Sequence, residues 1–423
     1  MKGRLREIVE VEQVISGAGR GGRGESRGAT QLTARLGWTG LGLVALLAAC
    51  SPSSFNFGGG GGGGVGGQML PRAAGQTFGK GPVRVALLLP LSGDPALTAV
   101  GVSMANASQL AVDFIEKSET IGDNITVVLK DTGGSAPGAS QAAVQAVQEG
   151  ASLILGPLRA DQVTAVGGVA KAAGIPVIGF SNNSGAASPG VYLLNVLPET
   201  EVRRSMSYVK RLGKKAYAAV FPNTDFGRIQ EGAFRQAASD LGLNARAVYN
   251  FSSETEARAV IAQLVPLLQA GQIDALFIPD RATAPSFGVL LEEAAIPTGS
   301  IQIIGSADWN GDQGIANTPY LAGAVYPAVD DAGYQALLPE YQAKFGVAPH
   351  ALSTIAYTAT ILANASSLAN GTPRYDRAQL TLPAGFNGRD GVFRFLADGR
   401  SDYALVMKKV TIGGANIVDG AKL

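Results

Sequence analysis

Hydrophobic residues between positions 82 and 304 occur in short continuous runs, and most runs are followed by a longer segment with helical spacing. A run that is apolar throughout is typical of a strand buried on both faces of a parallel sheet. We expect strands over residues 83–90, 125–131, 152–156, 176–179, 216–221, 245–249, 275–278 and 301–304, and a last one over residues 403–410.

The segments between these strands predict helices. Apolar positions with a period near 3.6 occur from Val102 to Ile115. Further helices are expected over residues 138–149, 160–173, 226–241, 254–270, 284–295, 333–345 and 353–369. Strands that alternate with helices favour an α/β fold with parallel sheets covered on both faces.

The strand–helix series runs twice, with an extended crossover expected at residues 191–197. We therefore predict a two-lobed fold, in which each lobe is a doubly wound parallel sheet and extended crossovers form a hinge. The expected ranges are 82–197 for lobe 1, 198–325 for lobe 2, 326–370 for a return to lobe 1, 371–411 for a crossing segment with the last strand, and 412–423 for a C-terminal tail. Ligands of open parallel sheets bind beyond the carboxyl ends of the strands.

The single cysteine, Cys50, ends an apolar run of about 14 residues that follows a basic leader, too short for a bilayer span of roughly 20 residues. The order Leu47-Ala-Ala-Cys50 resembles a bacterial lipobox, which implies a signal peptide over residues 1–49 and a lipid on Cys50. Ser51 then favours the outer membrane. A signal cut after Ala49 without lipid, or a buried free cysteine, are the alternatives.

A glycine-rich segment follows Cys50, with seven consecutive glycines from Gly58. We predict a flexible tether over residues 50–81, with a root-mean-square reach of about 30 Å. A phosphate-binding loop would need a strand before the glycines and a helix after them, and the pattern predicts neither.

The charge balance is nearly even, with 34 Lys and Arg against 33 Asp and Glu. Since no basic stripe is present, nucleic acid is not expected as a partner. A single cysteine also excludes an intramolecular disulfide.

Five short motifs occur in order at natural spacing, and together they resemble the type I periplasmic binding proteins of the leucine/isoleucine/valine-binding family. They begin at Val85, Asp131, Gly156, Gly174 and Asp225. The opening phrase and the lipobox are most similar to penicillin-binding protein activator lipoproteins, although a glycine-rich tether stands here where the best-known activator has a helical-repeat domain.

The resemblance implies a ligand site between the lobes. In leucine-type binders, hydroxyls and backbone amides of lobe 1 hold the ligand, and an acidic group of lobe 2 pairs with its ammonium. Trp309 is expected either to stack on a ligand or to pack the lobe rim, and Asp308 is the better match for the acid, with Asp280 second. The candidate ligand contacts are Ser92, Arg159, Ala160, Ser181, Asn182, Asn183, Ser184, Asp225, Phe226, Asp280, Asp308 and Trp309.

Local matches to enzyme motifs are incomplete. Asp131-Thr-Gly lacks the second carboxylate motif of an aspartic protease. Asp308 begins a calcium-like loop that has Gln313 where glycine is required. His350 is the only histidine, so two-histidine chemistry is excluded. We expect no enzyme activity, no cofactor and no metal.

The sequence therefore predicts a lipid-anchored periplasmic protein that closes two lobes on an amino-acid- or peptide-like ligand for transport. An ABC transporter permease would be its partner. The alternative is an outer-membrane activator of a peptidoglycan synthase that uses the same fold as a docking surface.

Overall fold

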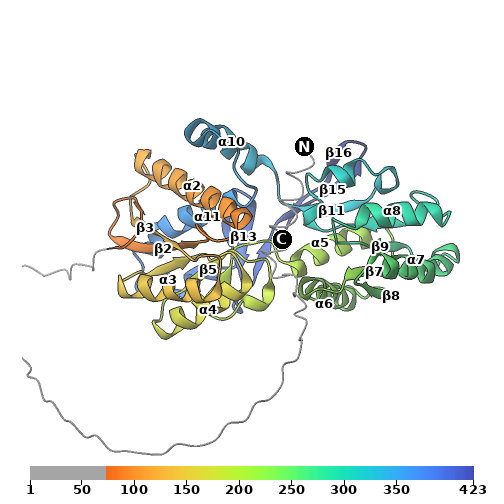
Figure 1. Ribbon diagram of the computed structural model, residues 1–423, viewed down its shortest axis with the longest axis horizontal. Helices are drawn as coiled ribbons and strands as arrows, with labels where there is room; N and C mark the ends of the chain where they lie inside the picture. Colours follow the sequence, from red (N-terminus) through yellow and green to blue (C-terminus); the bar gives the residue numbers. More distant parts are fainter. Residues whose placement is uncertain (1–72) are drawn as a thin grey trace, which may run out of the picture. The chain divides into compact units, whose positions relative to one another are not determined.

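The computed structural model describes residues 73–423, which fall within one compact unit and form two α/β lobes (Figure 1). The predictions for residues 1–72, including the signal peptide, Cys50 and most of the tether, lie outside the described residues. Among residues 73–423, no helix is both long and apolar enough to span a membrane.

The first lobe is built on a six-stranded sheet. Its strand order is β1-β3-β2-β4-β5-β6, and β1 alone pairs antiparallel to its neighbour. The strands are β1 (Thr77–Phe78), β2 (Val83–Leu89), β3 (Ile125–Asp131), β4 (Leu153–Leu155), β5 (Val177–Gly179) and β6 (Val191–Leu193).

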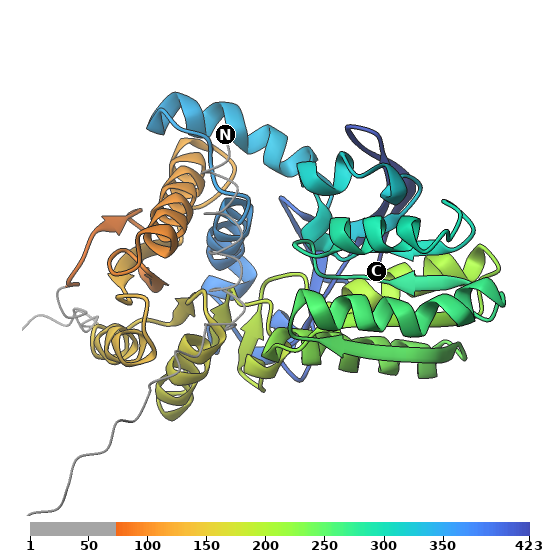
Figure 2. The same cartoon turned by 45° about the vertical axis from the view of Figure 1, so that its right-hand side comes forward.

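Helices cover both faces of this sheet because the side chains of β2 alternate between two apolar clusters. Val85 and Leu87 pack in the cluster that includes residues of α2 and α11, whereas Ala86 and Leu88 pack with residues of α3 and α4. Figure 2 shows α2 beside α11. The helices of this lobe are α2 (Pro95–Lys117), α3 (Ala136–Gln148), α4 (Ala160–Ala172), α10 (Ala332–Phe345) and α11 (Ser353–Asn364).

The second lobe repeats this plan. The order β8-β7-β9-β10-β11 matches β3-β2-β4-β5-β6 of the first lobe, and two antiparallel strands, β15 and β16, extend the sheet beyond β11. Helices α5 and α6 share one core cluster with the sheet, and α7 and α8 share another. The strands are β7 (Ala216–Pro222), β8 (Asn244–Phe251), β9 (Ala275–Phe277), β10 (Gln302–Ile304), β11 (Val325–Ala328), β15 (Leu405–Thr411) and β16 (Gly414–Lys422). The helices are α5 (Pro198–Arg211), α6 (Asp225–Asp240), α7 (Glu254–Gln269) and α8 (Ala284–Glu293).

Three connections join the lobes: residues 194–197 before α5, residues 329–331 before α10, and Ala404 between β14 and β15. A three-stranded antiparallel sheet precedes the last connection and consists of β12 (Phe386–Gly388), β13 (Gly391–Phe395) and β14 (Ser401–Tyr403). The short helices are η1 (Ser184–Ala186), η2 (Ala307–Trp309), α9 (Gln313–Ala316), η3 (Pro319–Leu321), α12 (Ser366–Ala369) and α13 (Arg377–Leu380).

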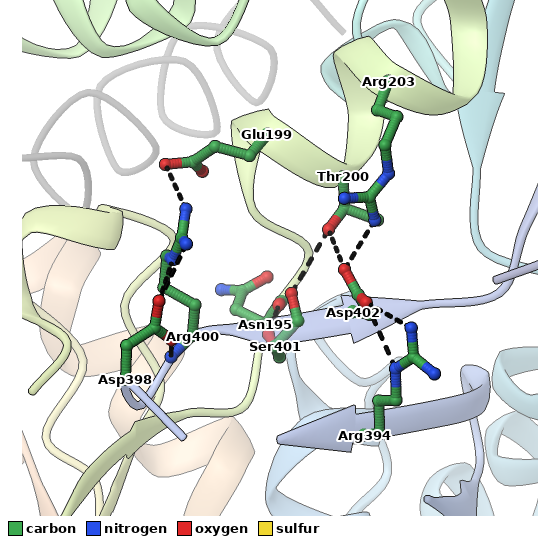
Figure 3. Close-up of polar contacts among 9 residues, drawn as sticks. All are labelled: Asn195, Glu199, Thr200, Arg203, Arg394, Asp398, Arg400, Ser401 and Asp402. Carbon is green, nitrogen blue, oxygen red and sulfur yellow. Dashed lines mark hydrogen bonds and ion pairs between the residues drawn. The ribbon is translucent and has the colours of Figure 1, made fainter. Parts of the chain in front are cut away.

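A polar cluster fixes two of these connections to each other (Figure 3). The Asp402 carboxylate on β14 contacts Arg203 Nη2 of α5 at 2.6 Å and Arg394 Nη2 of β13 at 2.9 Å. Ser401 Oγ donates a hydrogen bond to the Asn195 carbonyl oxygen at 2.7 Å. These contacts hold the start of α5 against β14.

Six predicted segments need correction. The sequence predicts a tether that reaches residue 81, but Thr77–Phe78 form β1, which pairs with β3. It also predicts that lobe 2 ends at residue 325, whereas β11 continues in the sheet of that lobe to Ala328. The sequence predicts a tail over residues 412–423, but β16 there pairs with β15. Much of this strand is exposed, so it has no continuous apolar run. The segment 371–411 contains the three-stranded sheet and α13 in addition to the last strand. The crossover at 191–197 begins with β6, and the helix at 353–369 is interrupted at Ala365.

Candidate functional site

A cavity of about 840 Å³ lies where the strand ends of the two lobes meet. The second lobe contributes residues that follow β7, β8, β9 and β10, among them Thr224, Ser253, Asp280 and Asp308. The first lobe contributes Asn182 after β5, together with residues around the start of α11 and the three-stranded sheet. The carboxyl ends of the parallel strands thus build this cavity, as expected for open α/β sheets.

The second lobe lines the cavity with four carboxylates, of which Glu254 lies at the exposed rim and Glu201, Asp280 and Asp308 lie deeper. Glu201 lies in the first turn of α5 and is 8% exposed, and its Oε2 accepts a hydrogen bond from the Ala307 backbone N–H at 3.2 Å. Burial and the nearby Asp308 charge raise the pKa of Glu201 well above its ordinary value. Burial also raises the pKa of Asp308, with Asp280 adding to this effect and Arg281 opposing it.

Asp280 and Arg281 follow β9 side by side. Asp280 Oδ2 accepts hydrogen bonds from the Thr283 backbone N–H at 3.1 Å and from Thr283 Oγ1 at 2.6 Å, which fixes this carboxylate at the start of α8. Arg281 Nε lies 3.8 Å from Asp312 Oδ2, and the Arg281 side chain is largely buried. Arg281 thus brings a positive charge near Asp308, where it opposes the rise in the pKa of that carboxyl group.

The first lobe supplies a separate carboxylate. Asp390 Oδ2 accepts a hydrogen bond from Thr354 Oγ1 at 2.9 Å, and both residues line the cavity. Burial raises the pKa of Asp390 to about 6, although the Thr354 hydrogen bond works against this shift. The buried Tyr403, whose pKa is raised by burial and by Asp390, lines the same wall.

An apolar wall completes the cavity. Phe251 and Phe287 meet edge to face, with ring centroids 5.2 Å apart. Phe226, Val289 and Leu290 also line this part of the cavity. The cavity therefore combines carboxylates, one largely buried guanidinium group and a hydrophobic surface, a composition suited to a small organic ligand.

Four of the predicted contacts line this cavity: Asn182, Phe226, Asp280 and Asp308. Asn182 Oδ1 is buried, and it has no hydrogen-bond partner among the described residues. It is therefore the one residue of the predicted 181–184 turn that offers a free acceptor at the cavity.

The other lobe 1 candidates do not line the cavity. Ser92 Oγ donates a hydrogen bond to Asp131 Oδ2 at 2.5 Å, which fixes the loop after β2 to the end of β3. Arg159 Nε pairs with Asp161 Oδ1 at 3.1 Å, at the start of α4, where Ala160 is the first helical residue.

The turn after β5 uses most of its polar groups internally. Ser181 is fully buried, and its Oγ accepts a hydrogen bond from the Asn183 backbone N–H at 3.1 Å. Asn183 Oδ1 caps η1 by accepting a hydrogen bond from the Gly185 backbone N–H at 2.9 Å, and Ser184 begins that short helix.

Two lobe 2 candidates also lie away from the cavity. Asp225 is exposed and pairs with Arg228 within the first turn of α6. Trp309 is 1% exposed, and its Nε1 donates a hydrogen bond to the Pro279 carbonyl oxygen at 3.2 Å. Of its two expected roles, the structure shows packing: the ring anchors η2 and thereby positions Asp308.

Sequence reasoning missed Glu201, Arg281, Thr354 and Asp390. Arg281 directly follows the predicted Asp280 after the end of β9, so its position was a usable signal. Glu201 lies in the first turn of the helix that follows the first interlobe connection. Thr354 and Asp390 come from the returning part of the first lobe, and no strand-end pattern marks them. Among residues 73–423, no group of three or more His, Cys, Asp or Glu side chains is arranged to hold a metal ion.

Comparison with protein families identifies the class of protein that this fold and cavity define. The family model described as periplasmic binding protein matches residues 82–381. The chain therefore belongs to the periplasmic binding protein family, as the resemblance at the sequence level predicted. No curated protein matches the chain significantly.

Solved structures support the two-lobed fold. A branched-chain amino acid ABC transporter protein from Rhodospirillum rubrum, itself described as putative, has 17% identity and a TM-score of 0.68, with 79% of this chain and 99% of that chain covered. A substrate-binding protein from Desulfitobacterium hafniense in complex with Leu has 16% identity, a TM-score of 0.60 and coverage of 79% and 99%. A solute-binding protein from R. palustris in complex with benzoate has 18% identity, a TM-score of 0.55 and coverage of 81% and 98%.

Proposed function

We propose that this protein is a non-catalytic solute-binding protein whose two lobes close on one small amino-acid-like molecule and present it to an ABC transporter permease. The cavity shared by the two lobes is the observation that carries this proposal. An amino acid brings an ammonium group, a carboxylate and a side chain, and the cavity offers a counterpart to each.

The ammonium group is assigned to Glu201 and Asp308. Both carboxylates are held in place without the ligand, Glu201 by the Ala307 backbone and Asp308 by the anchored helix η2. An ammonium ion between them would favour their ionised forms, which burial disfavours in its absence. Arg281 is the counterpart of the ligand carboxylate, since a guanidinium group pairs well with a carboxylate. The ligand side chain would lie against Phe226, Phe251 and Phe287.

The location of the protein is inferred from its family and from the sequence before residue 73. The family places it in the periplasm, and the lipobox-like sequence ending at Cys50 supports a lipid anchor. Ser51 favours the outer membrane. Mass spectrometry of the membrane fraction tests the anchor, because a lipid on Cys50 adds a diacylglycerol mass that Cys50→Ala lacks.

Ligand binding is tested by thermal unfolding of the purified protein against a panel of amino acids, short peptides and small carboxylic acids. A ligand at 100 times its dissociation constant adds about 2.7 kcal/mol to the free energy of unfolding, enough to raise the midpoint by several degrees. The proposal requires at least one such shift, and the shift must disappear in Asp308→Ala. The exposed Asp225→Ala is the matched control. A flat response across the panel would refute the proposal.

The second candidate function is activation of a peptidoglycan synthase. The glycine-rich segment after Cys50 favours it, because a long tether suits a lipoprotein that must reach a partner away from its own membrane. Synthase activity measured with and without the purified protein separates the two functions. Stimulation of the synthase together with a flat ligand panel would support activation.

A further inference from the structure

We propose that the ligand carries two cationic nitrogen groups and a net positive charge, as lysine, arginine and α,ω-diamines do. This inference rests on the proposed function and specifies its ligand class. It starts from the charges around the cavity, whose wall includes five carboxylates and two guanidinium groups.

One of the two guanidinium groups is already neutralised at the exposed rim. Arg258 Nη2 lies 3.1 Å from Glu254 Oε1, one turn away on α7, and Arg258 Nη1 lies 3.6 Å from Glu293 Oε2. Removing the Glu254–Arg258 pair leaves four carboxylates, on Glu201, Asp280, Asp308 and Asp390, against the single guanidinium of Arg281. A neutral amino acid brings one ammonium group and one carboxylate, so it would leave most of these carboxyl groups without a cationic partner.

The carboxylates form two separate groups, one on each lobe. Glu201, Asp280 and Asp308 belong to the second lobe, and Asp308 interacts electrostatically with both of the others. Asp390 belongs to the first lobe, where its hydrogen-bond partner is the neutral Thr354. A single ammonium group would pair with the carboxylates of one lobe only and leave those of the other lobe without a cation. Two cationic groups joined by a spacer can pair with carboxylates of both lobes.

Burial raises the pKa values of Glu201, Asp308 and Asp390, so a cationic group placed beside each of them would stabilise its ionised form. The orphan Oδ1 of Asn182 adds another acceptor for an ammonium N–H. Phe251, Phe287 and Leu290 offer a surface for the hydrocarbon spacer between the two cationic groups. The volume of about 840 Å³ suits an organic ligand of this kind.

The test is isothermal titration of the purified protein with 1,5-diaminopentane, lysine and arginine, alongside leucine, benzoate and calcium chloride. We expect at least one of the three cationic ligands to bind at least tenfold more tightly than leucine or benzoate. We also expect Glu201→Gln and Asp390→Asn each to weaken that binding at least tenfold, since each removes a charge and keeps the size of the side chain. Asp225→Asn removes an exposed carboxylate and should leave the affinity unchanged. Circular dichroism and thermal unfolding verify that each variant is folded.

The outcomes separate this inference from the proposed function. Tight binding of leucine or benzoate without binding of the cationic ligands overturns the inference and leaves a solute-binding protein. Calcium binding with the amines inert overturns the inference in favour of a metal site. Binding of a cationic ligand that is unchanged in both Glu201→Gln and Asp390→Asn places the ligand elsewhere and also overturns it. If no member of this panel or of the wider panel binds, the proposed function fails as well.

Discussion

Arg203 Nη2 lies 2.6 Å from Asp402 Oδ1, and this ion pair joins α5 of the second lobe to β14 beside the connection between the lobes (Figure 3). Asp402 also binds Arg394 of the first lobe, so one carboxylate is shared by arginines of both lobes. Burial alone would raise the pKa of Asp402, but hydrogen bonds from Arg394 and Arg203 lower it below its ordinary value. The first turn of α5 also carries Glu201, so this contact orients a residue of the ligand cavity.

Replacing Asp402 by alanine should therefore destabilise the connection between the lobes. The carboxylate side chain is 7% exposed, whereas Arg203 and Arg394 are partly exposed. We expect a loss of about 2 kcal/mol in the free energy of unfolding, between the values for exposed and buried ion pairs. Urea denaturation measures this loss. Asp398→Ala, which removes an exposed partner of Arg400, should cost less than about 1 kcal/mol. Equal losses in the two variants would contradict the role given to Asp402.

Asp390 should make stability depend on pH. Its folded-state pKa of about 6 lies above the ordinary value of 3.8, so the folded protein holds this proton more tightly than the unfolded chain does. The free energy of unfolding should therefore fall as pH rises from about 4 to 6, by at most about 3 kcal/mol from this group. Asp390→Asn should remove that part of the dependence. Its stability relative to the native protein should therefore be higher at pH 7 than at pH 4. Urea denaturation of both proteins across this range is the measurement, and parallel pH profiles would contradict the assignment.

Gly305 should be intolerant of a side chain because the Trp309 ring covers it. A Cβ on Gly305 would lie 2.2 Å from Trp309 Cδ2, so Gly305→Ala must displace the ring that anchors η2. We expect a loss of about 1–3 kcal/mol in stability, as for other overpacked cores, together with weaker ligand binding through Asp308. Gly168 lies in the exposed part of α4, where an added Cβ would meet no atom within 4 Å, and Gly168→Ala should stabilise by up to about 1 kcal/mol. Thermal unfolding compares the two variants, and a neutral Gly305→Ala would show that the ring moves freely.

A buried ion pair fastens the start of the described chain to the first lobe. Lys130 Nζ lies 2.9 Å from Glu149 Oε1 and donates a hydrogen bond to the Ala74 carbonyl oxygen, and Ala74 N–H donates to the same Glu149 oxygen. Lys130→Ala leaves the Glu149 carboxylate without its cation, so we expect a loss of about 3 kcal/mol. Limited proteolysis should then cut near residues 73–79 faster than in the native protein. Lys80→Ala, which removes an exposed partner of Glu116, is the control. An unchanged cleavage rate in Lys130→Ala would contradict this anchoring role.

The apolar runs in the sequence predicted the buried centre of each sheet accurately. Residues 125–131 were expected as a strand and form β3, and the run at 83–90 contains β2. Parallel strands covered by helices on both faces are apolar throughout, so they can be recognised from a single sequence. Strand β16 escaped prediction because many of its positions are exposed. The sheet β12–β14 escaped prediction because its strands are only 3 to 5 residues long and their pairing partners are set by tertiary contacts.

The site was predicted only in outline, since position after a strand indicates a neighbourhood and not the direction of a side chain. Asp308 and Trp309 are adjacent in sequence, yet Asp308 lines the cavity and Trp309 enters the core. Asp390 can be assigned to the cavity only from the folded structure, which places it beside Thr354, 36 residues away in sequence. In the 181–184 turn, hydrogen bonds decide which polar groups face the cavity and which ones cap the turn. A pattern of residue types does not specify these hydrogen bonds.

The most direct test of a ligand site between the lobes is a titration that asks whether one ligand needs both of them. For a ligand identified by the thermal panel, isothermal titration should give one site per chain in the native protein. Binding should fall at least tenfold both in Asn182→Ala of the first lobe and in Asp308→Asn of the second, and remain unchanged in Asp225→Asn. Native affinity in either cavity variant would contradict a ligand held between the two lobes.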